Sequence, residues 1–593
     1  MSAPHVVADQ RVSAPPTTDS VPPTASHTAA TRHLCTGVYI DAAFRDRVLR
    51  KVHNSPYKRV APSYAFDLIP LMRNAWYARL LETALHTALV GSFSIPALLG
   101  HQTVAALMAG GLLLYWLVWH EVATCRSLVH EHVRHRQAQR DGDTVKQSQL
   151  TFKRLQRNRG TSAWDELRGR LRIILPAGVI TVVVILGLVA ARPDELLLVG
   201  QLSLGLAASA MFLGGLRQGL INRFHDPKQL RPHRMTPRER TVDSQQQHPC
   251  AVYRRISTRD DEDEMPFFSM YGNESPFVGT GELMHHWDPP MTVRILSEGD
   301  EDTASREYRT PPFTAHELVD HLESAVQTLD RDHDDVRLDL DVRRRVYISE
   351  TAASADRTLL RREPTREEIA TIIDDPHGRK HHFLEVTAPA EDGELVTVVL
   401  LRVIVQGRML SIDFAGCALA QTPHEYQRVE AYGEHGVLAV LAGALRTLVT
   451  LPAEFGKLWR LVELPALFGL ALWAQRDRTL TPRRGVMIGP RLSVRAEQAQ
   501  EWSKVQLDRT TLLKNMKIIE KRLLNAAEDF LRARNVDTSE FDKQATKIFN
   551  SGIMNLGNNN QVNGNILGGL HMNALLSAQQ GGDAGQQKGA TES

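Results

Sequence analysis

The densest group of side chains that could carry chemistry in this sequence lies near residue 380. It comprises the run Asp-Asp-Pro-His-Gly-Arg-Lys-His-His at residues 374–382, followed by Glu385. Imidazoles and carboxylates are ligands for divalent metals, so replacing His381, His382 and Glu385 by alanine would test for an enzyme. However, the neighbouring Arg and Lys would repel a metal ion, and the Pro and Gly spacing is typical of an exposed loop. We therefore assign no catalytic, cofactor-binding or metal-binding residue.

The rest of the chain contains none of the common catalytic motifs. A glycine-rich phosphate loop followed by Lys, a nucleophile elbow, a zinc-protease helix and a dinucleotide fingerprint are all missing from it. The four cysteines are far apart and form no paired motif, which predicts free thiols; they are Cys35, Cys125, Cys250 and Cys417. We expect the protein not to be an enzyme, and we predict no cofactor and no nucleic-acid partner.

Four apolar stretches, in two closely spaced pairs, decide where any functional group would lie. They cover residues 80–99, 103–119, 173–191 and 196–216. Each has close to the roughly 20 residues that a helix needs to cross the hydrocarbon core of a bilayer. The second pair has no ionisable residue within its stretches, whereas a buried helix of a soluble protein usually keeps a polar face. The sequence therefore predicts four transmembrane helices in two hairpins, at residues 80–120 and 173–216.

Two features of these stretches bear on function. Glu82 and His86 lie in the opening turns of the first stretch, and an ionisable residue inside a membrane is a functional candidate. Glu82 lies so near the start that a carboxylate reaching to the interface is the simpler interpretation. Small residues would let helices approach closely; they are Ala106, Gly110, Gly205, Ser209, Ala210 and Gly214.

Positive charge is distributed unevenly around the four stretches. Basic residues precede the first stretch, fill the loop at residues 121–172 and follow the last stretch, whereas the turn at 100–102 has none. The other short turn has only Arg192, which two acidic residues offset. Because Lys and Arg near a span favour the cytoplasmic side, we expect both termini in the cytoplasm and the protein in a bacterial cell (inner) membrane. The lipid bilayer is then a partner.

The N-terminal region divides into two predicted parts. Residues 1–31 are rich in Pro, Ser, Thr and Ala without an apolar core, which predicts a disordered tail rather than a cleaved signal. Residues 32–79 are expected to form an N-terminal cytoplasmic segment.

Residues 217–495 are predicted to form a cytoplasmic α+β domain. Val, Ile and Leu flank Gln-Gly-Arg at 406–408, which predicts a hairpin of strands at 395–406 and 408–414. Shorter predicted strands lie at residues 251–256, 276–278, 291–296, 336–342, 345–349 and 382–387, and a helix is predicted at 312–329. Strands interspersed with a few helices are typical of the α+β class.

An apolar stretch at residues 436–473 lies inside this domain. Charged residues and prolines interrupt it, so we expect neither half to span a membrane. Three interpretations remain open: helices lying in the headgroup region, a buried soluble core, or a re-entrant or spanning pair.

The C-terminal part differs in composition from the rest. Apolar residues recur at steps of three and four from Leu512 to Phe530, which predicts a helical hairpin at 496–550 that docks on a partner or on a second helix. In the Asn/Gly-rich tail at 551–593, apolar residues alternate with Asn. Period-two patterns are strand-like and Asn ladders stabilise cross-β assemblies. The tail is therefore either disordered or a homotypic β-assembly segment.

Two parts of the sequence resemble known proteins. The run Ser-Pro-Phe-Val-Gly-Thr-Gly-Glu-Leu at 275–283 with Trp287, and the strand pair at 398–414, resemble recurrent segments of actinobacterial multi-pass membrane proteins. The excess of 56 Arg over 14 Lys is compatible with that origin. The family has no assigned biochemistry, so the resemblance implies a topology but no site residue. Residues 553–570 resemble the Asn/Gly-rich amyloid-signalling motifs of bacterial and fungal immune-type proteins.

The function predicted from these observations is that of a membrane-tethered scaffold or signalling component. It would self-associate as a homo-oligomer, or bind a partner protein, through its C-terminal module. The alternative is a transport or channel accessory subunit, and a conductance or flux measurement would separate the two.

Overall fold

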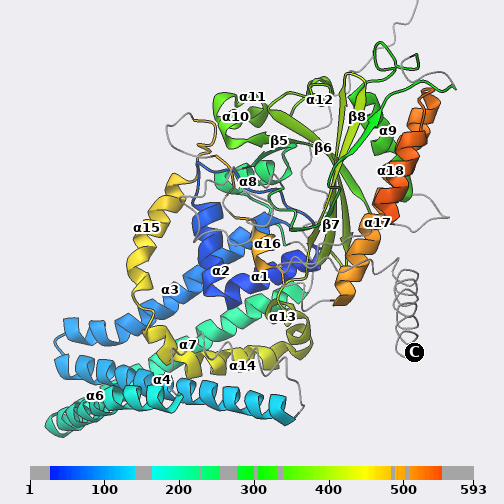
Figure 1. Cartoon of the computed structure of the whole chain (residues 1–593). Helices are drawn as coiled ribbons and strands as arrows, with labels where there is room; N and C mark the ends of the chain where they lie inside the picture. The colour runs from blue at the N-terminus through cyan, green and yellow to red at the C-terminus, as the bar shows by residue number, and fades with distance from the viewer. Residues whose placement is uncertain are drawn as a thin grey trace, which may run out of the picture.

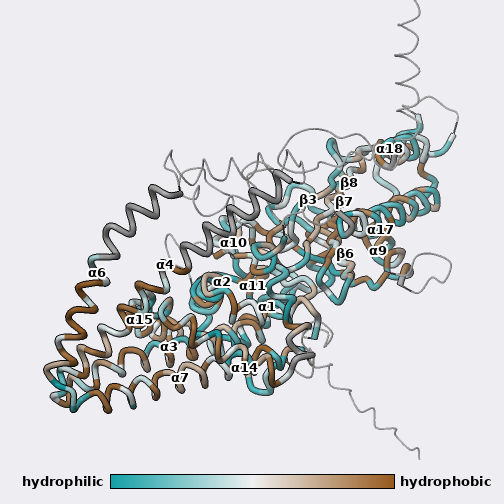
Figure 2. The backbone as a smooth tube through the Cα atoms, turned by 90° about the horizontal axis from the view of Figure 1, so that it is seen from below, coloured by the Kyte–Doolittle hydropathy of each residue, from teal (hydrophilic) through white to brown (hydrophobic). Residues whose placement is uncertain are grey.

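The computed structural model describes residues 27–140, 163–225, 230–253, 277–299, 305–330, 338–481, 488–490, 492–500 and 506–550. Two parts are visible in Figure 1, a layer of long helices at the lower left and a mixed sheet flanked by helices at the upper right. Figure 2 shows that hydrophobic residues dominate the long helices, whereas the sheet part carries more hydrophilic residues.

The helical layer contains five long helices and the shorter α15 among the described residues. They are α3 (Leu68–Leu98), α4 (Gln102–Arg140), α6 (Ala163–Ala191), α7 (Leu196–Asn222), α14 (Val429–Phe455) and α15 (Arg460–Trp473). α3 packs on α4, as a hairpin requires, and α6 packs on α4 as well. α7 lies along α14, a helix that comes more than two hundred residues later in the chain.

The prediction of four transmembrane helices in two hairpins is wrong. Within the described residues, three helices are long and apolar enough to cross a membrane: Gln102–Trp119, Pro193–His225 and Gly436–Phe455. The stretch at 80–99 is the second half of α3, where Glu82 and His86 interrupt the apolar run. In α6 the apolar helix is the shorter Gly178–Ala191. Conversely, Arg446 and Pro452 do not prevent Gly436–Phe455 from forming a continuous apolar helix.

Small residues in this layer set the distance between α7 and α14. A Cβ atom on Gly214 would lie 2.3 Å from the Thr447 hydroxyl, and one on Gly443 would lie 2.7 Å from the Gln218 side chain. Gly205 has open space around it instead. Of the small residues singled out in the sequence, Gly214 and Ala210 are therefore buried in helix contacts, and close packing of backbones is what glycine permits.

The sheet has seven described strands. They are β1 (Cys250–Tyr253), β3 (Glu282–His286), β4 (Met291–Arg294), β5 (Asp341–Ser349), β6 (Lys380–Ala390), β7 (Leu395–Gln406) and β8 (Met409–Leu419). Their order is β1-β5-β6-β7-β8-β3, and β4 also pairs with β8. β1 is parallel to β5 and the other pairs are antiparallel. The prediction of an α+β domain is confirmed.

The predicted hairpin at 395–414 is also confirmed. β7 and β8 pair from Gln406 opposite Met409 to Val396 opposite Leu419. The turn needs a residue with positive φ, and Gly407 has φ of 60°. β3 was missed, and residues 277–278 form no strand. Predicted strand residues 254–256, 276 and 336–337 lie outside the described residues.

Helices cover one face of the sheet. α9 (Ala315–Gln327), α17 (Gln506–Ala533) and α18 (Ser539–Asn550) lie along it in Figure 1. The apolar positions of α17 face inward, so that Leu512, Met516 and Ile519 share a core with residues of β7 and β8. The helix predicted at 312–329 is α9. The helix predicted from the apolar spacing between Leu512 and Phe530 is α17, and the surface on which it docks is the chain's own sheet.

The other face of the sheet is covered by the N-terminal segment. Its short helices are α1 (Ala29–Ile40), α2 (Ala42–Arg47) and the π-helix Val48–His53. Tyr64 from this segment packs with Tyr347 and Phe383 on the sheet. The remaining short helices are α8 (Pro237–Gln247), α10 (Glu350–Ala355), α11 (Thr358–Arg361), α12 (Arg366–Ile373), α13 (His424–Gln427) and α16 (Val494–Gln498). The segment thus connects the helical layer with the sheet.

Candidate functional site

The group around residue 380 does not converge on one point. β6 begins at Lys380, and successive residues of a strand point to opposite faces. Phe383 belongs to the core under the N-terminal segment, whereas Leu384 belongs to the core under α17. His381 and Glu385 are therefore on one side of the sheet and His382 is on the other, so the three residues cannot form one metal or acid–base site.

Glu385 instead forms a buried ion pair. Its two carboxylate oxygens accept from Arg345 Nε at 2.7 Å and from Arg345 Nη2 at 2.9 Å, and the Tyr64 hydroxyl donates to it at 2.9 Å. Burial opposes the charge on Arg345, but Glu385 outweighs this effect and keeps the pKa of the guanidinium above its usual range. Burial and the Glu385 charge together raise the pKa of the Tyr64 hydroxyl. This group fastens the N-terminal segment to the sheet.

His382 is isolated on the opposite face. It is 5 % exposed, and its Nε2 atom has no hydrogen-bond partner among the described residues. Burial, together with the nearby positive charge of Arg344, lowers its pKa to about 3. An imidazole that stays neutral at physiological pH and lacks an orienting partner is a core residue rather than a general base.

A second buried carboxylate joins α17 to the edge of the sheet. Glu520 lies 2.9 Å from His285 Nε2 and accepts from Trp287 Nε1 at 2.7 Å and Lys517 Nζ at 2.7 Å. Burial alone would raise the pKa of Glu520, but the hydrogen bond and charge of His285, aided by Lys517, hold it below the ordinary value. All of its partners come from the chain itself, so the carboxylate anchors α17.

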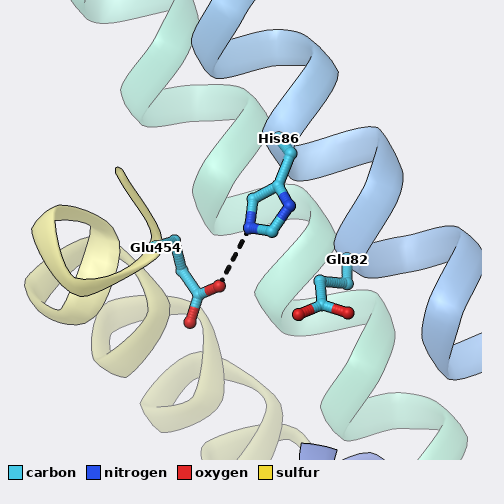
Figure 3. Close-up of side chains that lie close together, drawn as sticks. All are labelled: Glu82, His86 and Glu454. Carbon is cyan, nitrogen blue, oxygen red and sulfur yellow. Dashed lines mark hydrogen bonds and ion pairs between the residues drawn. The ribbon is translucent and has the colours of Figure 1, made fainter. Parts of the chain in front are cut away.

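The most unusual charged group lies where α2, α3, α14 and α15 meet. We call it the polar junction. Its members are Arg45, Asp46, Arg79, Glu82, His86, Glu454, Lys457 and Arg460. Figure 3 shows Glu82 and His86 on α3 with Glu454 facing them from α14. In the described part of the chain, these three are the residues whose potential metal-ligand atoms lie within 4.8 Å of one another.

Glu82 is the centre of the polar junction. Arg79 Nη1 donates to it at 2.9 Å and Arg460 Nη1 at 2.8 Å, and Arg45 forms a third ion pair. Its side chain is 10 % exposed. Glu82 is therefore not a lone carboxylate at the interface but the shared acceptor of three guanidinium groups. Hydrogen bonds between a guanidinium and a carboxylate are charge-assisted and stronger than those between neutral groups.

His86 and Glu454 form the other half. His86 Nε2 lies 3.1 Å from Glu454 Oε2, and Lys457 Nζ donates to Glu454 Oε1 at 2.8 Å. A divalent cation between these side chains would need oxygen atoms that arginine and lysine already occupy. Three carboxylates face four cationic side chains, so the electrostatics disfavour a further cation. The polar junction joins four helices and is not arranged as a metal centre.

Sequence reasoning found only part of the polar junction. Glu82 was recognisable as an ionisable residue near an apolar stretch, and Arg79 stands three residues before it. The partners Arg45, Glu454 and Arg460 are remote in sequence and gave no signal.

A large apolar surface borders the polar junction. α7, α14 and α15 expose large hydrophobic side chains, which are Leu197, Leu204, Phe212, Val437, Leu438, Leu441, Leu445, Val449, Val462, Phe468, Leu470 and Leu472. Trp459 and Trp473 lie at the two ends of α15 and are also exposed. Contiguous surfaces of this kind mark a site of protein or membrane interaction.

Comparison with known proteins identifies one similarity. Residues 287–563 match the family model of the AbeC-like domain. The match begins just after β3 and includes the strands β4 to β8 as well as α14, α15, α17 and α18, so the apolar pair α14–α15 belongs to the matched segment. No curated protein and no solved structure matches the chain.

Proposed function

We propose that the protein is a membrane-anchored scaffold or signalling component of a bacterial cell (inner) membrane, with its sheet domain and both termini on the cytoplasmic side. The observation that carries this proposal is the exposed apolar surface of α7, α14 and α15. Val437 is 83 % exposed, Leu204 73 % and Phe212 70 %. Side chains of this size exposed along neighbouring helices fit lipid better than water.

The connections of α14 and α15 support this orientation. Thr422, before α14, donates to the Glu394 carboxylate at 2.9 Å, and Arg495, after α15, donates to the Glu394 carbonyl at 2.7 Å. Both ends of the α14–α15 pair are therefore attached to the sheet domain. Because the chain leaves and returns on the same side, we expect the α14–α15 pair to make no net crossing of the bilayer.

The attachments between the two parts support a role in signalling. The polar junction connects α2 with α3, α14 and α15, and Tyr64 connects the same N-terminal segment with Glu385 on the sheet. These bonds are buried and specific in geometry, so a displacement of the apolar helices would be transmitted to the sheet domain.

Alkaline extraction of membranes tests the anchoring. We expect the full-length protein to stay in the membrane pellet after carbonate treatment. Arginine within a spanning helix costs about 2.5–3.5 kcal/mol of insertion free energy, so Leu204→Arg with Phe212→Arg should release a large fraction. The matched control is Met409→Arg, a partly exposed hydrophobic residue of β8, which should remain in the pellet. Complete extraction of the unaltered protein would contradict membrane anchoring.

Self-association through the tail is the second part of the proposal. Residues 551–593 lie outside the described residues, and the support is the alternating Asn/apolar pattern of an amyloid-signalling-like segment. The same proposal takes the chain to be actinobacterial, on its excess of Arg over Lys. The full-length protein in detergent should form a larger oligomer than a chain ending at Asn550. Equal size would contradict assembly through the tail, and solute flux into reconstituted vesicles would favour the channel alternative.

A further inference from the structure

α15 differs from the other apolar helices in its direction. In Figure 1 it runs across the direction of α4 rather than along it. It is only 14 residues long, which at 1.5 Å per residue is too short to cross a bilayer. A short helix set across helices that span a membrane lies parallel to the membrane plane.

The two faces of α15 are different. The inner face carries Leu467 and Ala471, which are buried, and Phe468 packs edge-on against Trp76 of α3 at 5.9 Å between ring centroids. The outer face carries Val462 and Leu472, which are 82 % and 66 % exposed. The outer face is thus apolar and uncovered.

Aromatic and cationic side chains are paired at both ends of the helix. At the start, the Arg460 guanidinium lies 5.9 Å from the Trp459 ring, and at the end the Arg478 guanidinium lies 3.8 Å from the Trp473 ring. Both rings are exposed. Trp beside Arg or Lys is typical of the headgroup level of a membrane, where an amphipathic ring and a cation are both well solvated.

Further cations stand beside the helix. Arg50 pairs with Glu463, and its side chain remains 51 % exposed; Lys457 pairs with Glu454, and its side chain remains 42 % exposed. Arg476 is exposed as well. These positive groups border the apolar face, so the surface is complementary to phosphate groups.

The backbone of α15 is held in place from the inside. Arg79 Nη2 donates to the Arg460 carbonyl at 3.0 Å, and Asn54 Nδ2 donates to the Leu467 carbonyl at 3.1 Å. The helix is therefore fixed with its apolar face outward before any ligand binds. Pre-ordering of this kind reduces the entropic cost of binding.

We propose that the outer face of α15 lies in the headgroup region of the bilayer and that the cations at its ends bind anionic lipid. The proposal rests on the proposed membrane anchoring and names the lipid class and the surface that binds it. Trp459 and Trp473 mark the level of the interface, Val462 and Leu472 enter the acyl boundary, and Lys457 and Arg478 contact phosphate. Each cation near an anionic surface favours the docked state by about five-fold.

A second copy of the chain fits this surface less well. A symmetric interface would bring the same patch of both copies together, and the cations at the ends of α15 would then face like charges. Glu463, an acidic residue of α15, is already paired with Arg50. Like charges brought together oppose association, whereas an anionic membrane neutralises them.

Fluorescence quenching in vesicles tests the proposal with the full-length protein. Cys35, Cys250 and Cys417 are buried, so a thiol-reactive dye can be placed by Val462→Cys in a Cys125→Ser background. Vesicles contain phosphatidylcholine with or without phosphatidylglycerol, and a nitroxide is placed either at the headgroup or deep in the acyl chain. We expect strong quenching of the Val462 label by the headgroup nitroxide, and stronger quenching with phosphatidylglycerol.

Two control labels separate this proposal from the membrane anchoring itself. A label at Leu204 on α7 should be quenched by the deep nitroxide, and a label at Met409 on β8 should not be quenched. Quenching at Leu204 without quenching at Val462 would overturn the α15 proposal and leave the anchoring intact. Quenching at neither position would overturn both.

The lipid class is tested by charge reversal. Lys457→Glu with Arg478→Glu should abolish the effect of phosphatidylglycerol on the Val462 label, while Lys380→Glu on the sheet domain should retain it. If the double variant, the Lys380→Glu variant and the labelled protein without these changes respond equally to phosphatidylglycerol, the assignment of Lys457 and Arg478 to lipid phosphate is overturned.

Discussion

Replacing Glu385 should destabilise the sheet domain far more than replacing an acid in an exposed ion pair. In the unaltered protein the side chains of Arg345 and Glu385 are 2 % and 1 % exposed. Glu385→Ala leaves the Arg345 guanidinium buried without its carboxylate, which costs about 3–5 kcal/mol of the free energy of unfolding. The Tyr64 hydroxyl loses its acceptor as well, which adds about 1 kcal/mol.

The matched control is Glu368→Ala. Glu368 also pairs with an arginine, Arg362, but their side chains are 37 % and 58 % exposed. An exposed pair is screened by water and contributes little to stability, so the Glu385→Ala variant should be much the less stable of the two. This contrast does not depend on the detergent, because both acids lie in the sheet domain.

Urea titration of the full-length protein in detergent, read by pulse proteolysis, measures the difference. The double variant Arg345→Met with Glu385→Leu should recover much of the loss, since replacing both partners removes the unpaired charge. Equal urea midpoints for the Glu385→Ala and Glu368→Ala variants would refute the reasoning. If the urea midpoint of the Glu385→Ala variant falls as expected, a loss of cellular activity in that variant reports unfolding and not catalysis.

Three further predictions concern other parts of the chain. The pKa of His382 is lowered to about 3, whereas the unfolded chain binds this proton below about pH 6.5. The free energy of unfolding should therefore fall as the pH drops from 6.5 towards 3, by up to about 1.4 kcal/mol per pH unit from this residue. In the His382→Phe variant, the pH dependence of the urea midpoint should lose this contribution. An unchanged pH dependence would contradict the burial of His382. Glu82→Gln should reduce the yield of folded protein in membranes, because three guanidinium groups lose the negative charge that balances them, at about 3 kcal/mol. Glu463→Gln in an exposed pair should cost under about 1 kcal/mol; equal yields would contradict the polar junction. Gly214→Ala should lower the melting temperature in detergent, since overpacking costs about 1–3 kcal/mol. Gly205→Ala should leave the melting temperature unchanged, because there is open space around Gly205. A similar effect at both positions would argue against the α7–α14 contact.

The parts of the fold that were predictable depend on local sequence. The β7–β8 hairpin follows from two strand-like runs and a glycine at the one position with positive φ. The inward face of α17 follows from its apolar spacing, although nothing in the spacing indicates that its partner is the chain's own sheet. β3 was missed because its five residues, Glu282–His286, include two histidines and show no clear alternation.

The candidate site depends on contacts between remote segments. Glu82 accepts from Arg45 and Arg460, which precede it by 37 residues and follow it by 378 residues. Charge patterns within one helix cannot indicate such partners. The apolar helix Gly436–Phe455 was also not predicted, because Arg446 and Pro452 interrupt the apolar run in the sequence. One arginine and one proline near the end of a helix are tolerated when the remaining residues are apolar.

The place of α17 in the fold has a consequence for the order of events on the ribosome. The sheet is complete in sequence at Leu419, but α17, one of the helices that cover its face, begins at Gln506. At about 5–20 residues per second the strands wait several seconds for this cover. During that time the apolar helices α14 and α15 emerge while the sheet still lacks α17. A nascent chain interrupted between these helices and α17 would expose apolar surface of the sheet together with two apolar helices, and we expect such a chain to need a chaperone.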